Sequence, residues 1–302
     1  MRVLITGGTG LIGRALSADL AADAHQVIVL SRSPERASGL PAGVRAERWD
    51  AQTADGWVHL ADGADAIVNL AGENIGAGRW TDERKQRILN SRLDAGQAVV
   101  QATERVSQKP GVVIQASGIG YYGPRGKEEL DETAKPGEDW LAQVAVQWED
   151  STLPVEGMGV RRAIIRTGVV LDAKDGALPR MVQPFRLYVG GPLGGGQQWF
   201  PWIHLVDEVA AIRFLIEIPE ASGPFNLVAP NPATNGQVSR ALGRVLGRPA
   251  FMPIPGLALR LMFGEMATLL LDGQRAVPRR LLDLGFQFRY LIVEAALKDV
   301  LG

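Results

Sequence analysis

Two groups of residues have the types and the spacing for ligand chemistry. Glycines stand at positions 7, 8, 10 and 13, and Ser117, Tyr121 and Tyr122 lie close together nearer the middle of the chain. Glycine lets backbone N–H groups approach an anion, and a phenol hydroxyl can donate a proton to a reacting oxygen. The first group therefore indicates phosphate binding, and the second indicates proton transfer.

The elements around the glycines are those that a phosphate site needs. Residues 3–6 are apolar or β-branched and predict a buried strand, and apolar positions among residues 11–20 recur with helical spacing. Strand, glycine turn and helix in this order form the dinucleotide fingerprint, in which the helix N-terminus faces the phosphates. The residues predicted to bind there are Gly7, Thr9, Gly10, Leu11, Ile12 and Gly13. A glycine turn with a purely structural role is the alternative.

The next predicted strand, residues 26–30, ends in Ser31 and Arg32. Enzymes that use NAD place an acidic residue here, which binds the ribose hydroxyls and would repel a 2′-phosphate. An arginine beside a hydroxyl would instead hold that phosphate through charge-assisted hydrogen bonds. We therefore expect NADP(H) rather than NAD(H); the alternative is that Arg32 merely begins a solvated loop.

Three further segments are expected beside the same cofactor. Asp50 follows a predicted strand at residues 44–49, where its carboxylate would either accept from the adenine amino group or close a turn. A fourth strand leads into small residues, which let the chain pass close to the ribose and diphosphate. The helix after Thr81 carries Arg92, which would reach a phosphate or extend along the surface. The positions expected at the cofactor are Asp50, Leu70, Ala71, Gly72, Glu73 and Arg92.

A fifth predicted strand, residues 112–117, leads to the second group. Ligands of doubly wound sheets bind at the carboxyl ends of the strands, so we expect Ser117 at both cofactor and substrate. One of Tyr121 and Tyr122 is expected to face the substrate as a proton donor, and the other to pack with its hydroxyl satisfied. His204 is expected to be structural; the alternative is a substrate site walled by the neighbouring tryptophans.

Composition excludes several other classes of protein. The net charge of −1 and the apolar fraction of 46% predict a soluble globular protein with no nucleic-acid or membrane partner. Because cysteine is absent, disulfides and thiolate chemistry are excluded, and no metal site is predicted. The first strand begins so near residue 1 that we expect no signal peptide and a cytoplasmic protein. A monomer or a homodimer is expected.

Taken together, the motifs make the chain resemble the extended short-chain dehydrogenase/reductases. More narrowly, it is similar to their atypical branch of epimerase family proteins, which are NAD-dependent epimerase/dehydratase-like. Residues 6–13, 31–32, 69–75, 79–80, 91–92, 120–123 and 200–204 carry the resemblance, and residues 246–297 look like the small C-terminal domain of this branch. The resemblance covers essentially the whole chain. It implies NADP(H) bound by the glycine turn, Ser31, Arg32, Leu70, Ala71 and Arg92.

The same resemblance exposes a missing part. Its typical members use a serine or threonine, a tyrosine, and a lysine four residues after that tyrosine. The lysine lowers the pKa of the tyrosine and holds the nicotinamide ribose. No Tyr-x-x-x-Lys occurs in this sequence, and the corresponding helix begins Trp140-Leu141-Ala142. Tyr121 or Tyr122 would then act without a lysine, at a phenol pKa near ~10.

The sequence as a whole predicts an α/β protein with a Rossmann-type doubly wound parallel sheet and a smaller C-terminal, substrate-side domain. The large domain is expected to comprise residues 1–170 and 205–230, and the smaller one residues 171–204 and 231–302. The predicted function is that of an NADP(H)-binding oxidoreductase or epimerase acting on an unidentified small carbonyl or hydroxyl compound. A non-catalytic NADP(H)-binding sensor or interaction protein is the alternative, because the lysine is absent.

Overall fold

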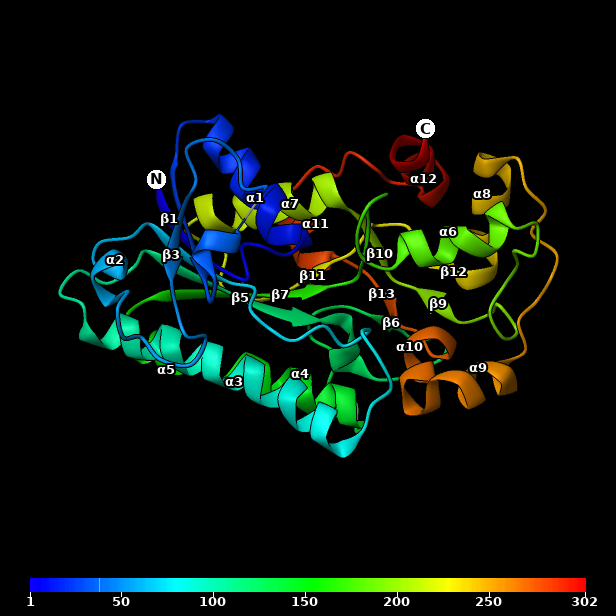
Figure 1. Ribbon diagram of the computed structural model, residues 1–302, viewed down its shortest axis with the longest axis horizontal. Helices are drawn as coiled ribbons and strands as arrows, with labels where there is room; N and C mark the ends of the chain where they lie inside the picture. The colour runs from blue at the N-terminus through cyan, green and yellow to red at the C-terminus, as the bar shows by residue number, and fades with distance from the viewer. Residues whose placement is uncertain (38) are drawn as a thin grey trace.

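The computed structural model describes residues 1–37 and 39–302. A seven-stranded sheet runs through its larger part (Figure 1) in the order β11-β7-β5-β4-β1-β2-β3, and all neighbouring strands are parallel. The strands are β1 (Arg2–Thr6), β2 (Gln26–Ser31), β3 (Arg45–Arg48), β4 (Ala66–Asn69), β5 (Val112–Gly118), β7 (Arg161–Thr167) and β11 (Gly223–Leu227). The predicted doubly wound parallel sheet is therefore confirmed.

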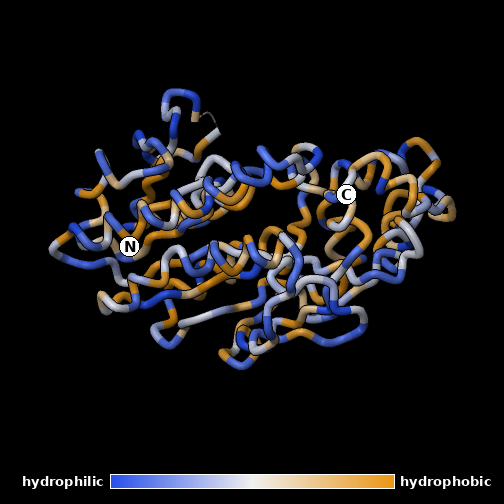
Figure 2. The backbone as a smooth tube through the Cα atoms, turned by 90° about the horizontal axis from the view of Figure 1, so that it is seen from below, coloured by the Kyte–Doolittle hydropathy of each residue, from blue (hydrophilic) through white to orange (hydrophobic). Residues whose placement is uncertain are grey.

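Helices cover both faces of this sheet. In Figure 1, α1 (Leu11–Ala22) and α7 (Leu205–Glu217) lie on one face, and α3 (Asp82–Arg105) and α4 (Trp140–Asp150) lie on the other. Alternate residues of β1 therefore serve two cores: Val3 and Ile5 pack with α1 and α7, whereas Leu4 packs with α3. Figure 2 shows hydrophobic and hydrophilic residues alternating along the helices, as expected for helices that bury one side.

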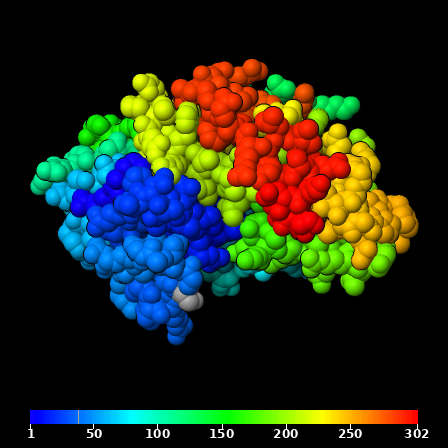
Figure 3. Space-filling model, turned by 90° about the horizontal axis from the view of Figure 1, so that it is seen from above, coloured from blue at the N-terminus to red at the C-terminus, as the bar shows by residue number. Residues whose placement is uncertain are grey.

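The second half of the chain builds a smaller core and then returns to the large sheet. The helices α6 (Leu178–Arg186), α8 (Asn235–Leu246) and α12 (Val293–Leu301) pack together around Trp202. Farther along, Phe286 packs edge-on against Phe214 of α7, and Leu281 lies in the core of the large sheet. Figure 3 shows this orange-to-red segment against the yellow-green part of the surface. The division into two domains stays a prediction.

The remaining elements are short and connect these layers. They are η1 (Pro34–Arg36), α2 (Val58–Ala61), η2 (Ile119–Tyr122), β6 (Glu129–Leu130), α5 (Pro154–Gly157), β8 (Val169–Leu171), β9 (Trp199–Phe200), β10 (Trp202–His204), β12 (Ala233–Thr234), α9 (Gly256–Phe263), η3 (Gly264–Ala267), α10 (Thr268–Leu271), β13 (Arg275–Ala276) and α11 (Arg279–Asp283), where η denotes a 3₁₀-helix. Among the described residues, no helix combines the length and apolar composition that a membrane span requires.

The start of α7 differs from the sequence pattern. Asp207 stands before apolar residues with helical spacing, a pattern that predicts a helix cap. However, α7 begins at Leu205 and His204 is its cap, accepting from the Val206 N–H at 3.1 Å. The Asp207 carboxylate instead accepts from the backbone N–H groups of residues 289 and 290, at 2.8 and 3.0 Å. Asp207 therefore serves as an acceptor for backbone N–H groups distant in the sequence and does not cap α7.

Replacing Gly13 by alanine is expected to destabilise the fold. An added Cβ would lie 2.5 Å from Gly8 Cα and 2.6 Å from the Gly7 carbonyl oxygen, so the turn and α1 would have to separate. Such overpacking costs about 1–3 kcal/mol, more than the ~1 kcal/mol that alanine gains over glycine in a helix. Denaturant unfolding should be compared with Gly157→Ala, whose added Cβ meets nothing within 4 Å. Equal stability of the two variants would contradict the close packing.

Candidate functional site

The turn between β1 and α1 is built from glycines whose backbone packs too closely on its neighbours to leave room for a side chain. Gly7 has a φ of +66°, and an added Cβ there would lie 2.7 Å from the Leu70 carbonyl oxygen. At Gly8 an added Cβ would lie 2.6 Å from the Val29 side chain. Gly10 precedes α1, and no described side chain caps the helix, so its first N–H groups stay available. The turn therefore presents backbone donors and the positive end of a helix to an anion.

Arginines gather where β2 and β3 end. The Arg32 side chain is exposed, and its backbone carbonyl accepts from Arg48 at 3.4 Å. Arg48 also pairs with Glu35 at 3.2 Å. Ser31 is half-buried, and its hydroxyl oxygen accepts from the Ser33 N–H at 3.2 Å. These contacts place positive charge beside the end of β2, where the sequence predicts the 2′-phosphate.

Asp50 lies beyond β3 with its carboxylate turned back onto its own chain. Its oxygens accept from the backbone N–H groups of Gln52 and Thr53 and from the Thr53 hydroxyl, each at 2.8 Å. Burial raises the pKa of Asp50, but the hydrogen bonds from Thr53 and Gln52 outweigh burial and hold the pKa below its ordinary value. Of the two roles considered for Asp50, the structure shows the turn. The adenine contact stays a prediction.

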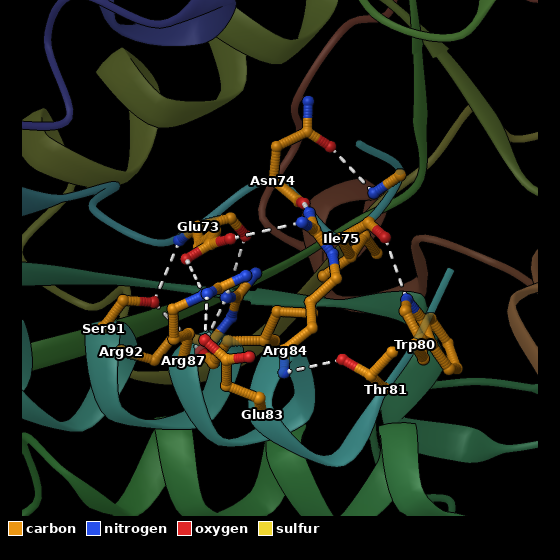
Figure 4. Close-up of polar contacts among 12 residues, drawn as sticks. Glu73, Asn74, Ile75, Trp80, Thr81, Glu83, Arg84, Arg87, Ser91 and Arg92 are labelled. Atoms are coloured by element: carbon orange, nitrogen blue, oxygen red, sulfur yellow. Dashed lines mark hydrogen bonds and ion pairs between the residues drawn. The ribbon is translucent and has the colours of Figure 1, made fainter. Parts of the chain in front are cut away.

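The chain after β4 passes over the glycine turn. It is then fastened to α3 (Figure 4). The Ser91 hydroxyl oxygen accepts from the Glu73 N–H at 3.0 Å, and Arg92 donates to the Glu73 carbonyl at 3.1 Å. One residue farther, the Asn74 carbonyl accepts from Arg84 at 2.7 Å. Because these bonds hold backbone atoms, they fix the path of the loop beside the turn.

Side chains of the same loop add further anchors. The Glu73 carboxylate lies 3.5 Å from Arg84 Nη1 and 3.8 Å from Arg87 Nε. The Trp80 indole donates to the Ile75 carbonyl at 2.9 Å. On α3, Arg84, Arg87 and Ser91 are spaced three and four positions apart and therefore share one helix face, which Figure 4 shows directed toward the loop. The motifs at residues 79–80 and 91–92 thus shape the loop.

Arg92 is buried beneath Gly72 rather than extended along the surface. Only 8% of it is exposed, and a Cβ added at Gly72 would lie 3.1 Å from Arg92 Cζ. Its guanidinium stacks over the Trp148 ring at 4.6 Å and also donates to the Ile88 carbonyl. Burial lowers the pKa of Arg92 to about 10, although Glu73 opposes this change. The surface role is excluded, and the phosphate contact stays a prediction.

Ser117, at the carboxyl end of β5, is part of a buried ionic network. Its hydroxyl donates to Glu149 Oε1 of α4 at 2.7 Å. The same carboxylate forms a two-pronged pair with Arg166 of β7, with bonds of 2.9 and 3.0 Å. Because the single hydroxyl proton of Ser117 is donated to Glu149, Ser117 cannot donate to a substrate carbonyl.

Tyr122 belongs to the same network and is fully buried. Its hydroxyl donates to Asn226 Oδ1 at 2.7 Å and accepts from Arg166 Nη1 at 3.0 Å. Burial raises the pKa of Tyr122 to about 12, although the charge of Arg166 and the hydrogen bond from Arg166 act in the opposite direction. Tyr122 is thus the tyrosine that packs with a satisfied hydroxyl, and it offers no proton to an open site.

Tyr121 is the half-buried tyrosine of the pair. Its ring lies over the Arg166 guanidinium, with the guanidinium carbon 3.4 Å from the ring centroid, and meets the Tyr122 ring edge-on at 5.2 Å. Arg166 is the neighbour that can hydrogen-bond the Tyr121 hydroxyl, and a guanidinium only donates, so the Tyr121 proton is not engaged by it. Of the predicted catalytic hydroxyls, only that of Tyr121 therefore retains a free donor.

The His204 segment is structural. His204 stacks on Tyr290 at 3.9 Å, and its Nε2 lies 3.3 Å from Asp299. Burial lowers the pKa of His204, although Asp299 opposes this change. Trp202 is 1% exposed in the smaller core, so it cannot wall a substrate site, whereas Trp199 is half-buried. The described residues bring together no three His, Cys, Asp or Glu side chains able to hold a metal ion.

Comparisons with known proteins cover the chain almost from end to end. Residues 3–229 match the family described as the NAD dependent epimerase/dehydratase family. The chain belongs to this family. Residues 254–300 match a domain of unknown function, DUF1731.

Relatives of matching length occur in animals and bacteria. Epimerase family protein SDR39U1 of Mus musculus is 38% identical over 310 residues, with 100% of both chains covered. Epimerase family protein YfhF of Bacillus subtilis (strain 168) is 37% identical, covering 100% of this chain and 98% of the relative. The crystal structure of human epimerase family protein SDR39U1 (isoform2) with NADPH superposes with a TM-score of 0.90, at 38% identity and 99% coverage of each chain. The resemblance to epimerase family proteins is thereby confirmed.

Sequence reasoning about this family member missed the residues that tie the hydroxyl groups together. Glu149, Arg166 and Asn226 are all buried and lie on three different elements. A signal was present, because Arg162 and Arg166 stand four residues apart in an apolar strand and so share one face. Buried charges on one face of a strand require a partner, although the pattern does not say which residue supplies it.

A buried acid in α7 was also missed. Glu208 is 0% exposed and accepts from the Thr167 hydroxyl at 2.8 Å, while its second oxygen has no partner among the described residues. Burial raises the pKa of Glu208 to about 8, and the Thr167 bond only partly opposes this rise. The side chain is therefore largely protonated at neutral pH.

Glu208→Gln is expected to change how stability depends on pH. Because the folded pKa of Glu208 is about 8 and the ordinary value is 4.5, the folded state binds the extra proton between these values. The free energy of unfolding of the wild type should therefore fall as pH rises across this window, by up to about 1.4 kcal/mol per pH unit relative to Glu208→Gln. Urea unfolding at several pH values measures this, with the exposed Glu104→Gln as control. Parallel pH profiles would contradict the assignment.

Proposed function

We propose that this protein binds NADP(H) across the carboxyl edge of its sheet and transfers hydride to or from a small carbonyl or hydroxyl compound. The supporting observation is the glycine turn itself. A Cβ added at Gly7 would collide with the Leu70 carbonyl, and no described side chain caps the first turn of α1. A pyrophosphate needs such close, side-chain-free donors. The human relative crystallised with NADPH, similar over 99% of this chain, supports the same cofactor.

The residues present fit a dinucleotide from one end to the other. The first N–H groups of α1 would bind the pyrophosphate, and Arg32 with Ser31 would bind the 2′-phosphate. The loop at residues 70–73 would border the ribose and diphosphate, held there by its anchors on α3. Arg92, buried directly under this loop, would supply positive charge to the phosphates from below.

The chemistry then depends on Tyr121. NADPH, when bound, supplies a hydride to a carbonyl carbon. Tyr121 would donate its phenolic proton to the carbonyl oxygen, so that an alcohol forms, and the phenolate would regain a proton from water. Ser117 would act indirectly, because its donor is spent on Glu149.

A non-catalytic sensor of the NADP(H) state is the second candidate. The observation that favours it is that the Ser117 and Tyr122 hydroxyls both donate to buried protein groups, at 2.7 Å each. A protein selected only to bind the cofactor has no need for free proton donors. The two candidates differ in turnover and share the binding site.

Arg32→Ala is expected to weaken NADPH binding far more than NADH binding, because only NADPH carries the 2′-phosphate. A charge-assisted hydrogen bond contributes about 1.5–3 kcal/mol, so the NADPH Kd should rise roughly ten- to hundredfold. Fluorescence titration with both cofactors measures this. Arg45→Ala, at the first residue of β3, is the matched control. Equal losses for both cofactors would refute the NADP assignment.

Tyr121→Phe is expected to abolish most turnover while preserving cofactor binding. Loss of a general acid lowers the rate about 10²–10⁴-fold. Stopped-flow absorbance of NADPH against a panel of carbonyl compounds identifies a reaction, which is then repeated with the variant. Tyr122→Phe is the comparison: it should lose about 1–3 kcal/mol of stability, since Arg166 and Asn226 lose a partner, and it should lower the rate less than Tyr121→Phe does. An unchanged rate in Tyr121→Phe would refute the proton donor, and no oxidation across the panel would favour the sensor.

A further inference from the structure

The ion pair between Glu149 and Arg166 lies directly behind the proposed proton donor. The two side chains are 8% and 4% exposed, so neither charge is relieved by solvent. The carboxylate also accepts from the Ser117 hydroxyl, and Arg162 donates to the Glu149 backbone carbonyl at 2.7 Å. Burying two charges is costly unless their remaining hydrogen bonds are satisfied, and here most of them are. The cost of burying the Glu149–Arg166 pair indicates that the pair has a functional role.

Arg166 contacts both tyrosines in different ways. Its Nη1 donates to the Tyr122 hydroxyl, and its planar face lies 3.4 Å from the Tyr121 ring centroid. A guanidinium suits this combination, because its edge donates in a fixed fork while its face stacks on an aromatic ring. A lysine ammonium has no such plane and would satisfy only one of the two tasks. The orientation of the Tyr121 ring therefore depends on the plane of Arg166.

No residue of α4 brings a lysine to this place. The helix reads Trp140-Leu-Ala-Gln-Val-Ala-Val-Gln-Trp-Glu-Asp, and Leu141 packs on Gly120, where an added Cβ would lie 2.7 Å from its methyl carbon. The positive charge nearest the Tyr121 phenol thus comes from β7 instead. Burial raises the pKa of Tyr121, Arg166 lowers it, and Glu149 and Asp150 of α4 raise it. Arg166 is the cation that favours the phenolate.

We propose that Arg166, clamped by Glu149, is the positioning residue of the site, which holds the Tyr121 ring and brings to it the positive charge that a lysine on α4 would supply. This inference rests on the proposed function, because it presumes that Tyr121 transfers the proton. Ser117 and Tyr122 complete the clamp by satisfying the outer atoms of the pair. Their burial near the site is explained by this role.

The test is a titration of Tyr121 by NMR in protein labelled at the tyrosine Cζ carbons. The chain has four tyrosines, so Tyr121→Phe assigns the signal. Titration runs from about pH 8 to about pH 12 in Glu149→Gln and in Glu149→Gln/Arg166→Met, which differ only in the arginine. We expect the Tyr121 midpoint to lie about one pH unit or more higher in the double variant, since an adjacent cation lowers a phenol pKa by that amount. Coincident midpoints would overturn the proposal.

A second comparison covers failure of the double variant to fold. Glu149→Gln alone removes the neutralising carboxylate, so its Tyr121 midpoint should lie below that of the wild type. An unchanged or higher midpoint would overturn the proposal. NADPH binding by the unmodified protein is measured separately: its absence refutes the proposed function, whereas binding with coincident midpoints refutes only the role of Arg166.

Discussion

The carboxyl edge of the sheet is organised by a backbone contact that leaves no room for a side chain. Gly7 lies against the Leu70 carbonyl, and Gly13 lies against Gly8, so β1, α1 and the chain after β4 meet within one small volume. The proposed pyrophosphate site follows from this contact. It exposes backbone donors at the start of α1, and it sets the path of the loop that α3 then fastens through Ser91 and Arg92.

At the carboxyl end of β5 the structure is organised by a buried network of polar side chains. Glu149 and Arg166 neutralise each other, and the hydroxyls of Ser117 and Tyr122 satisfy their remaining bonding positions. Such a network is rigid, because moving any member leaves a buried polar atom unpaired. Its rigidity explains why two of the three predicted hydroxyl groups have no free donor. The third, on Tyr121, is held in place by stacking on Arg166 and keeps its donor free.

The sequence predicted the sheet well because all its strands except β3 are largely buried and contain apolar runs. It predicted less well wherever a polar side chain has a choice of local and distant partners. The Asp50 carboxylate accepts from its own turn, which was one of its two interpretations. The Asp207 carboxylate does not cap α7 but accepts from the backbone N–H groups of residues 289 and 290. Arg92 turns inward beneath Gly72, although a helical arginine more often stays in solvent.

By itself, the sequence determined the strand–glycine–helix unit, the parallel sheet and the absence of Tyr-x-x-x-Lys, because these depend on residues close together in the chain. The tertiary structure alone decided which tyrosine has a free hydroxyl and which cation stands beside it. That decision depends on Glu149, Arg166 and Asn226, which come from three elements and meet only when α4 and β11 pack around β7. Local periodicity places such residues on a face, but only packing selects their partners.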